Sequence, residues 1–172
     1  MSENDIWKKA ETGNPDAQTQ VGDLYAHGDG VSQSWEHALL WYRKAAEQEH
    51  IPALINIGRL YELGRGVEQE GMDAALWYRR AAVQGDVEAQ HLLGTLYAFN
   101  PEVPNDFEEA VNWFRQAAEK NHAWAQCDLG IMYEFGHGVE QDLSMASEWF
   151  QKASEQGNGV ARGKLKQINN RA

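Results

Sequence analysis

The chain has 172 residues and a mean hydropathy of −0.64, and no apolar run approaches the roughly 18 residues that a membrane-spanning helix requires. Its 26 acidic and 15 basic residues give a net charge of −11, which argues against nucleic acid or anionic membrane as a partner, because both require positive surface. With a single cysteine, Cys127, and no apolar leader at the N-terminus, the sequence predicts one cytoplasmic domain.

A 36-residue repeat dominates the sequence. Seven columns keep one residue type in four consecutive units without insertions. These columns begin at Ala17, Gly22, Tyr25, Val31, Ala38, Trp41 and Ala45. Such a period is typical of helical solenoids, in which stacked units bury a core that no unit can bury alone. We assign the repeats, within a single domain 1–172, to residues 14–49, 50–85, 86–121 and 122–157.

The N-terminal residues 1–13 are predicted to form a cap helix, because Ile6 and Ala10 fall on the columns of a second repeat helix. In the first unit, apolar residues at helical spacing predict a first helix over 15–27. The glycine in the middle of that helix, Gly22, costs about 1 kcal/mol relative to alanine. Its recurrence in every unit therefore predicts a close approach of another helix.

Helix ends are also marked in the sequence. Gly28 suits the left-handed position that ends the first helix, and Ser34 is a good cap for a second helix over 35–48. Asp106 and Asp142 hold the same capping column in later units.

Residues 158–172 are predicted to form a C-terminal cap helix, because Ala161 continues a first-helix column. This segment holds four basic residues and no acidic one, which leaves a net charge of −15 on residues 1–157. The predicted fold is therefore an all-α, right-handed α/α solenoid of four helix-turn-helix repeats with partial cap helices at both ends.

The repeated pattern resembles the Sel1-like repeat, a relative of the tetratricopeptide repeat. It stands here as Ala89-Gln90, Leu93-Gly94 and Leu96-Tyr97 in the third unit, and as Gly66-Val67 and Trp77-Tyr78 in the second. The resemblance implies a scaffold or adaptor for other proteins. Some bacterial members bind host proteins, and some resemble immunity proteins encoded beside secreted toxins. The chain departs from the pattern at Asn100-Pro101, where the Gly-x-Gly turn is missing, and it lacks the cysteines of the disulfide-stapled subgroup.

The sequence predicts no catalytic, metal or cofactor site. The six histidines show no metal-ligand spacing, and Gly28-Asp29-Gly30 recurs as a turn and not as a phosphate-binding loop. His50 and His122 share one column at the start of a first helix, which favours a structural role. A Cys127 nucleophile would require a base, and His122 is expected about one helical turn away, too far for contact.

The predicted binding surface is the concave groove, which the first helices line in this class of solenoid. Its predicted contact residues are Asp16, Asp23, Ile55, Arg59, Glu62, His91, Trp124, Cys127, Ile131 and Glu134. In the fourth unit Trp124, Cys127 and Ile131 form an apolar patch. Two explanations stay open: the C-terminal cap covers this patch, or the patch anchors a partner.

We therefore expect a non-enzymatic scaffold or adaptor that binds a protein or peptide of basic character in the groove. An immunity or inhibitor protein that occludes a toxic enzyme is the alternative, and a small hydrolase that uses Cys127 is the second alternative. An adaptor tolerates several weak ligands, whereas an inhibitor requires one large, tight interface. The hydrolase would lose turnover on Cys127→Ala.

Overall fold

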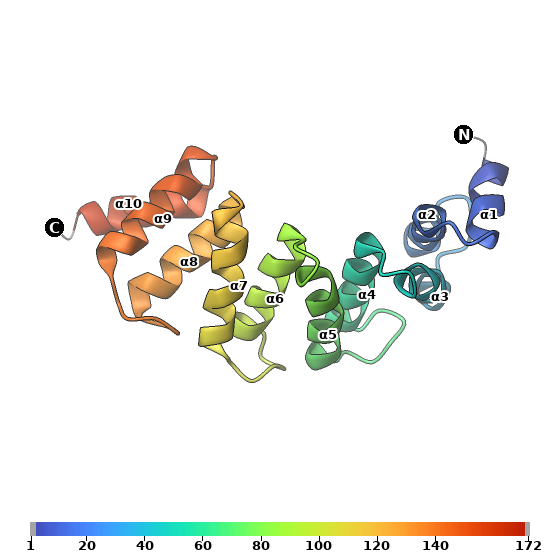
Figure 1. Cartoon of the computed structure of the whole chain (residues 1–172), viewed down its shortest axis with the longest axis horizontal. Coiled ribbons are helices and arrows are strands. Elements are labelled where there is room, and N and C mark those ends of the chain that lie inside the picture. The colour runs from blue at the N-terminus through green and yellow to red at the C-terminus, as the bar shows by residue number, and fades with distance from the viewer. Residues whose placement is uncertain (1–2, 171–172) are drawn as a thin grey trace. The chain divides into compact units, whose positions relative to one another are not determined.

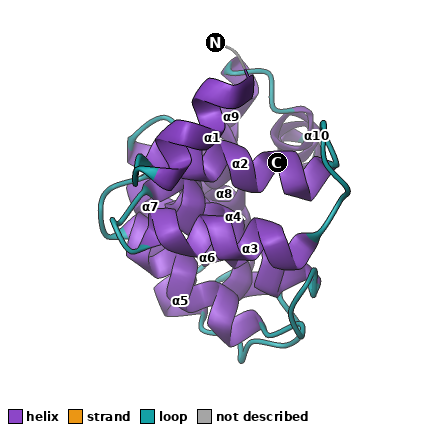
Figure 2. Cartoon of the chain, turned by 90° about the vertical axis from the view of Figure 1, so that its right-hand side faces the viewer, coloured by secondary structure: helices purple, strands orange, loops and turns teal. Residues whose placement is uncertain are grey.

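The protein consists of helices and connecting loops throughout residues 3–170, which are the residues that this computed structural model describes (Figure 1, Figure 2). Residues 1–2 and 171–172, the outer ends of the two predicted caps, lie outside the described residues. No strand occurs between residues 3 and 170, which confirms the all-α class. The helices are α1 (Glu3–Glu11), α2 (Pro15–His27), α3 (Trp35–Ala46), α4 (Ile51–Leu63), α5 (Gly71–Ala82), α6 (Val87–Phe99), α7 (Phe107–Glu119), α8 (Ala123–Phe135), α9 (Leu143–Glu155) and α10 (Gly159–Asn169).

The helices form two compact units, which divide between Gln84 and Gly85. In the first unit α1 packs on α2, α2 on α3, α3 on α4, and α4 on α5 (Figure 1). In the second unit the same pattern runs from α6 to α10. Within each unit, helices thus contact their neighbours along the chain, as stacked helix-turn-helix repeats do.

Side chains cap the helices at the positions that the repeat predicts. Ser34, Asp106 and Asp142 accept hydrogen bonds from first-turn backbone N–H groups of α3, α7 and α9, which confirms the predicted caps. A second column stands at the N-cap position of the first helices, and His50 is its one member among residues 14–158 that makes no side-chain capping bond. There Asn14 and Asp86 each accept a hydrogen bond from a backbone N–H 2.8 Å away.

One aromatic column locks the two helices of each repeat together. The column consists of Tyr42, Tyr78, Phe114 and Phe150, all of them buried. Each ring lies against the mid-helix glycine of the repeat's first helix, and a Cβ atom at Gly94 or Gly130 would come within 2.7 Å of a ring carbon. Only glycine lets the ring reach the helix backbone. This contact confirms the close approach that the repeated glycine predicts.

The loop inside each repeat is held by a side-chain amide. Gln33, Gln69, Asn105 and Gln141 share one column, and each donates to a carbonyl oxygen in the last turn of the preceding helix at 2.8–3.1 Å. In the third repeat Asn100 is extended, with φ −79°, and does not take the left-handed conformation open to it. That loop keeps its place without the Gly-x-Gly turn because the amide still binds it to the helix.

A further column takes positive φ shortly before each first helix. Gly13, Gly85 and Gly157 have φ of 89–94°, Asn121 has 67° and Glu49 has 55°. Glycine and asparagine adopt this conformation at low cost, whereas glutamate does not. At Glu49 the sequence carries no signal of a left-handed backbone, because glutamate rarely adopts that conformation.

Candidate functional site

A groove of about 200 Å³ lies between α2 and α4 in the first unit. Asp23 lines it from α2 and Arg59 from α4, with Leu63 at the end of α4 and Trp35 at the start of α3. Two residues predicted for the groove, Asp23 and Arg59, therefore border one hollow of the first unit.

Tyrosine hydroxyls from the aromatic lock hold two of the predicted groove carboxylates. The Tyr42 hydroxyl donates to Asp23 Oδ1 at 2.7 Å, and Asn56 Nδ2 donates to the same oxygen at 3.2 Å. The Tyr78 hydroxyl donates to Glu62 Oε2 at 2.7 Å. Burial, then the hydrogen bond and the charge of Asp23, raise the pKa of Tyr42 far above its ordinary value, so the hydroxyl remains a donor. Both carboxylates are thus held in fixed orientations, which lowers the entropy cost of binding a cation.

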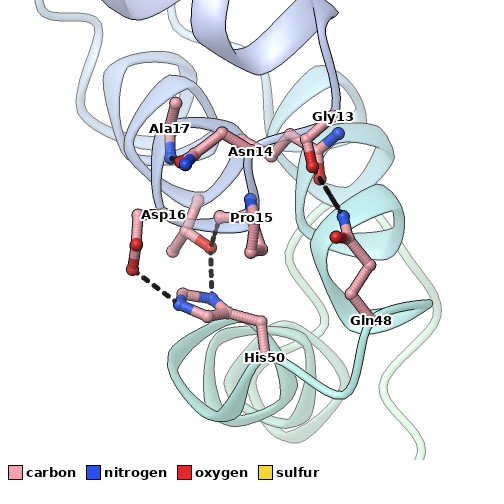
Figure 3. Close-up of polar contacts among 9 residues, drawn as sticks. Gly13, Asn14, Pro15, Asp16, Ala17, Gln48 and His50 are labelled. Carbon is pink, nitrogen blue, oxygen red and sulfur yellow. Dashed lines mark hydrogen bonds and ion pairs between the residues drawn. The ribbon is translucent and has the colours of Figure 1, made fainter.

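His50 joins the starts of two first helices in the same unit (Figure 3). Its Nε2 lies 3.0 Å from Asp16 Oδ1, and its Nδ1 lies 2.9 Å from Thr19 Oγ1. Beside it, Gln48 Nε2 donates to the Gly13 carbonyl oxygen at 2.9 Å (Figure 3). Asp16 from the predicted groove is therefore tied to His50, the residue that directly precedes α4.

The equivalent junction in the second unit brings together Glu88, His91, His122 and Asp128, which we call the His91–His122 cluster. His91 Nε2 lies 2.8 Å from Asp128 Oδ2, and His122 Nε2 lies 3.5 Å from Glu88 Oε2. The two imidazole ring centroids are 4.7 Å apart. Burial, followed by the proximity of His91, lowers the pKa of His122 and favours its neutral form.

The predicted apolar patch of the fourth repeat is divided in the structure. Cys127 is 1% exposed and packs with Phe150, Ala161 and the partly buried Ile131 in a cluster that includes α10 residues. Cys127, which the sequence placed among the groove residues, is therefore covered by the cap helix. Trp124 itself is 54% exposed. The covered-patch explanation applies to Cys127, and the indole remains at the surface.

Cys127 also has the wrong environment for a nucleophile. Burial, and to a lesser degree the charge of Asp128, raise the pKa of its thiol to about 12. A thiolate is the reactive form of cysteine, and this site strongly favours the thiol.

Two further predicted groove residues lie inside the protein. Ile55 is buried in α4, and Glu134 is buried near the end of α8. Lys164 Nζ donates to Glu134 Oε2 at 2.8 Å, so one charge of the basic C-terminal segment neutralises a buried carboxylate. Of the predicted set, Asp16, Arg59 and Trp124 are the exposed members.

The sequence places His91 in the predicted groove and His50 and His122 in one column, but no spacing along the chain connects them or points to Asp128. The signal lay in the register of the repeat. His50 meets Thr19 at one junction, and His122 meets His91 at the position two repeats further along. Contacts between successive repeats form the cluster, and spacings along the chain do not reveal them.

Among residues 3–170 no helix combines the length and the apolar character needed to cross a membrane. The model of the Sel1 repeat matches residues 15–50, 51–86, 87–122 and 125–158. The search of curated proteins found no significant match.

Solved structures resemble the chain closely. The protective antigen c5321 of uropathogenic Escherichia coli, which displays an SLR fold, is 37% identical with a TM-score of 0.95, over 99% of this chain and 37% of that one. A Sel1 repeat protein from Oxalobacter formigenes is 41% identical with a TM-score of 0.81, over 95% of this chain and 47% of that one. The chain thus spans less than half the length of either structure.

An immunity protein, Pa5087 of Pseudomonas aeruginosa, is 24% identical with a TM-score of 0.57, over 91% of this chain and 58% of that one. At this identity the likeness shows the fold alone. The four matched repeats cover most of the chain, and the repeat columns, the glycine–aromatic locks and the paired helices agree with them. The chain belongs to the Sel1 repeat family.

Proposed function

We propose that this chain is a non-enzymatic binding module that holds a protein or peptide of basic character along the faces of its first helices. The observation that carries the proposal is the fixed Asp23 carboxylate at the groove between α2 and α4. A carboxylate that is oriented before binding loses little freedom when it meets a lysine or arginine. The net charge of −11 would also attract a basic partner before contact.

The exposed indole of Trp124 is the second element of the proposal. Val160 of α10 occupies the same repeat column and is 48% exposed, so two apolar side chains stand at equivalent places in the second unit. Tryptophan is enriched among residues that dominate binding energy. We assign Trp124 as an apolar anchor for the partner.

The remaining functions predicted from the sequence have less support. The buried thiol of Cys127 opposes a cysteine-dependent hydrolase. The likeness to an immunity protein supports the fold and adds nothing for an inhibitor role. A single cysteine without a pairing partner in this sequence supports the expected reducing compartment, the cytoplasm.

Binding of labelled peptides tests the charge preference. Lysine-rich, neutral and glutamate-rich peptides of equal length are compared by fluorescence anisotropy, and the lysine-rich peptides are expected to bind best. Asp23→Asn keeps an oxygen for Tyr42 and should weaken that binding by about 1 kcal/mol, roughly fivefold. Glu148→Gln, on an exposed site of α9, is the matched control. Equal binding of all three peptide classes, with an association rate indifferent to salt, would contradict electrostatic recruitment.

Trp124→Ala tests the anchor. Affinity for the best peptide should fall by about 2 kcal/mol, roughly thirtyfold, while the free energy of unfolding changes by less than about 0.5 kcal/mol. Leu76→Ala, on an equally exposed side chain of α5, should leave affinity unchanged. A large loss of stability with unchanged affinity would show that Trp124 serves packing instead.

A further inference from the structure

The His91–His122 cluster places three metal-binding side chains within reach of one ion. One ligand atom from each of Glu88, His91 and His122 lies within 4.8 Å of the other two. Glu88 and His91 belong to α6, and His122 caps the start of α8. The residues therefore come from two successive repeats of the same unit.

The chemistry of these side chains suits a borderline divalent cation. Neutral imidazole nitrogen and carboxylate oxygen are both ligands of Zn²⁺. Asp128 Oδ2, 2.8 Å from His91 Nε2, is placed to orient that ring through its N–H. Both imidazoles are largely sheltered, with side-chain exposures of 16% and 20%, so the site is drier than a surface pair.

The geometry points to a Zn²⁺-binding site formed by Glu88, His91 and His122, which links the third repeat to the fourth. Zinc bonds of about 2.0–2.1 Å in a tetrahedral site require ligand atoms about 3.4 Å apart. The limit of 4.8 Å exceeds this requirement by about 1.4 Å, so side-chain rotation has to draw the ligand atoms together when the ion binds. The 3.5 Å separation of His122 Nε2 from Glu88 Oε2 already satisfies the requirement.

Metal binding changes one existing contact. His122 Nδ1 accepts a hydrogen bond from the Ala125 backbone N–H at 3.2 Å, which requires Nδ1 to be unprotonated. When Nε2 binds the metal, Nδ1 must carry the proton, so this capping bond is exchanged for the metal–nitrogen bond. The equivalent caps at Asn14 and Asp86 are shorter, 2.8 Å, so His122 gives up the weaker kind of cap.

The repeat provides a natural comparison for the proposed site. In the first unit Asp16 stands in the column of Glu88, Thr19 in that of His91, and His50 in that of His122. That junction has one imidazole, and Thr19 fills the place of the second. Two substitutions therefore remove a ligand with residue types that the repeat already accepts: His91→Thr, and His122→Asn after Asn14.

Titration of the metal-free protein with Zn²⁺ against a chromophoric chelator tests the site. The wild type is expected to bind one ion, and His91→Thr and His122→Asn should each weaken binding at least about tenfold. His50→Asn, the matched control in the first unit, should bind like the wild type. Far-UV circular dichroism verifies that each variant remains helical. Absence of saturable one-to-one binding, or equal binding by the wild type and both cluster variants, would overturn the proposal.

Cobalt supplies an independent readout of coordination. Co²⁺ in the wild type should give the visible d–d absorption of a four-coordinate site, and this absorption should be lost in His91→Thr but kept in His50→Asn. A spectrum like that of hydrated Co²⁺ in the wild type would refute an ordered site, whatever the zinc titration gives.

Discussion

Both units of the protein use the same glycine–aromatic lock, but the aromatic residue of the lock differs between them. In the first unit the locking rings are Tyr42 and Tyr78, whose hydroxyls donate to Asp23 and Glu62. In the second unit the rings are phenylalanines, at Phe114 and Phe150. The ring and its glycine are common to both units and hold the fold. The tyrosine oxygen is an addition that connects the core of the first unit to its candidate binding face.

The junctions between first helices also share one position in both units and differ at another. One column places His50 in the first unit and His122 in the second, each beside a carboxylate of the preceding first helix. The neighbouring column holds Thr19 in one unit and His91 in the other, so only the second unit pairs two imidazoles. Constant columns determine where side chains meet, and variable columns determine the chemistry at the meeting point.

The largest effect is expected from breaking the shared lock. Tyr78→Ala and Phe150→Ala should each lower the free energy of unfolding by about 3–5 kcal/mol, because each removes a fully buried ring. Urea denaturation followed by circular dichroism measures the loss. Trp77→Ala is the comparison, because this neighbouring indole is only partly buried, with Arg80 over its ring. We expect it to cost about 1–2 kcal/mol. An equal loss at Trp77 would mean that this indole belongs to the core as well, as the buried Trp113 of the same column does.

A second effect distinguishes the units at alkaline pH, because the cysteine lies in the second. Burial raises the pKa of Cys127 to about 12, so folding favours the thiol. The preference of the folded state for the Cys127 thiol contributes fully to stability below the pKa of cysteine in the unfolded chain, about 8.5. This contribution is lost as the pH rises from there towards 12. The free energy of unfolding should fall by up to about 1.4 kcal/mol per pH unit in that window.

Cys127→Ala is the control for this alkaline loss. The variant is less stable at neutral pH because it leaves a cavity, but its stability should decline less steeply between about pH 9 and pH 11. Parallel curves for the two proteins would contradict the raised thiol pKa. Denaturation at each pH, with reductant present, provides the measurement.

The sequence predicted the helices and their caps because those features depend on residues close together in the chain. The 36-residue register of Gly22 and its equivalents required a tight helix contact, and the structure supplies it. The candidate site was less accessible, since it depends on contacts between repeats. Cys127 and Ile131 share a helix stripe with Trp124, yet α10 covers the first two and leaves the third exposed. Helical periodicity identifies a face, whereas the packing of the next helix decides how much of that face is open.

A third prediction concerns the substitution Tyr42→Phe, which gives the first unit a phenylalanine ring like those of the second unit. Tyr42→Phe removes the hydroxyl that donates a hydrogen bond to Asp23, while the ring keeps its packing. The substitution should lower the free energy of unfolding by about 1 kcal/mol. In an Asp23→Asn background the same substitution should cost less, because the hydrogen bond no longer reaches a charged group. Thermal or urea denaturation of the wild type, the two single variants and the double variant gives the double-mutant cycle. Equal costs in both backgrounds would show that the charge of Asp23 contributes nothing to the bond.

The smallest predicted effect concerns the positive-φ column, where the first unit has Gly13 and Glu49 and the second has Gly85, Asn121 and Gly157. Glu49→Gly and Glu49→Ala both remove the carboxylate that pairs with Arg80, so they differ only in the backbone. With φ of 55° at this position, the glycine variant should be more stable than the alanine variant by about 1 kcal/mol.

Glu47 is the matched control for this backbone effect. It is also exposed and lies two residues earlier, but its φ of −61° is right-handed. There the order should reverse, with Glu47→Gly less stable than Glu47→Ala by about 0.5–1 kcal/mol. Urea midpoints of the four variants measure both differences. If alanine is the better residue at both positions, the left-handed backbone at Glu49 imposes no strain, and glycine and asparagine in that column of the second unit have another cause.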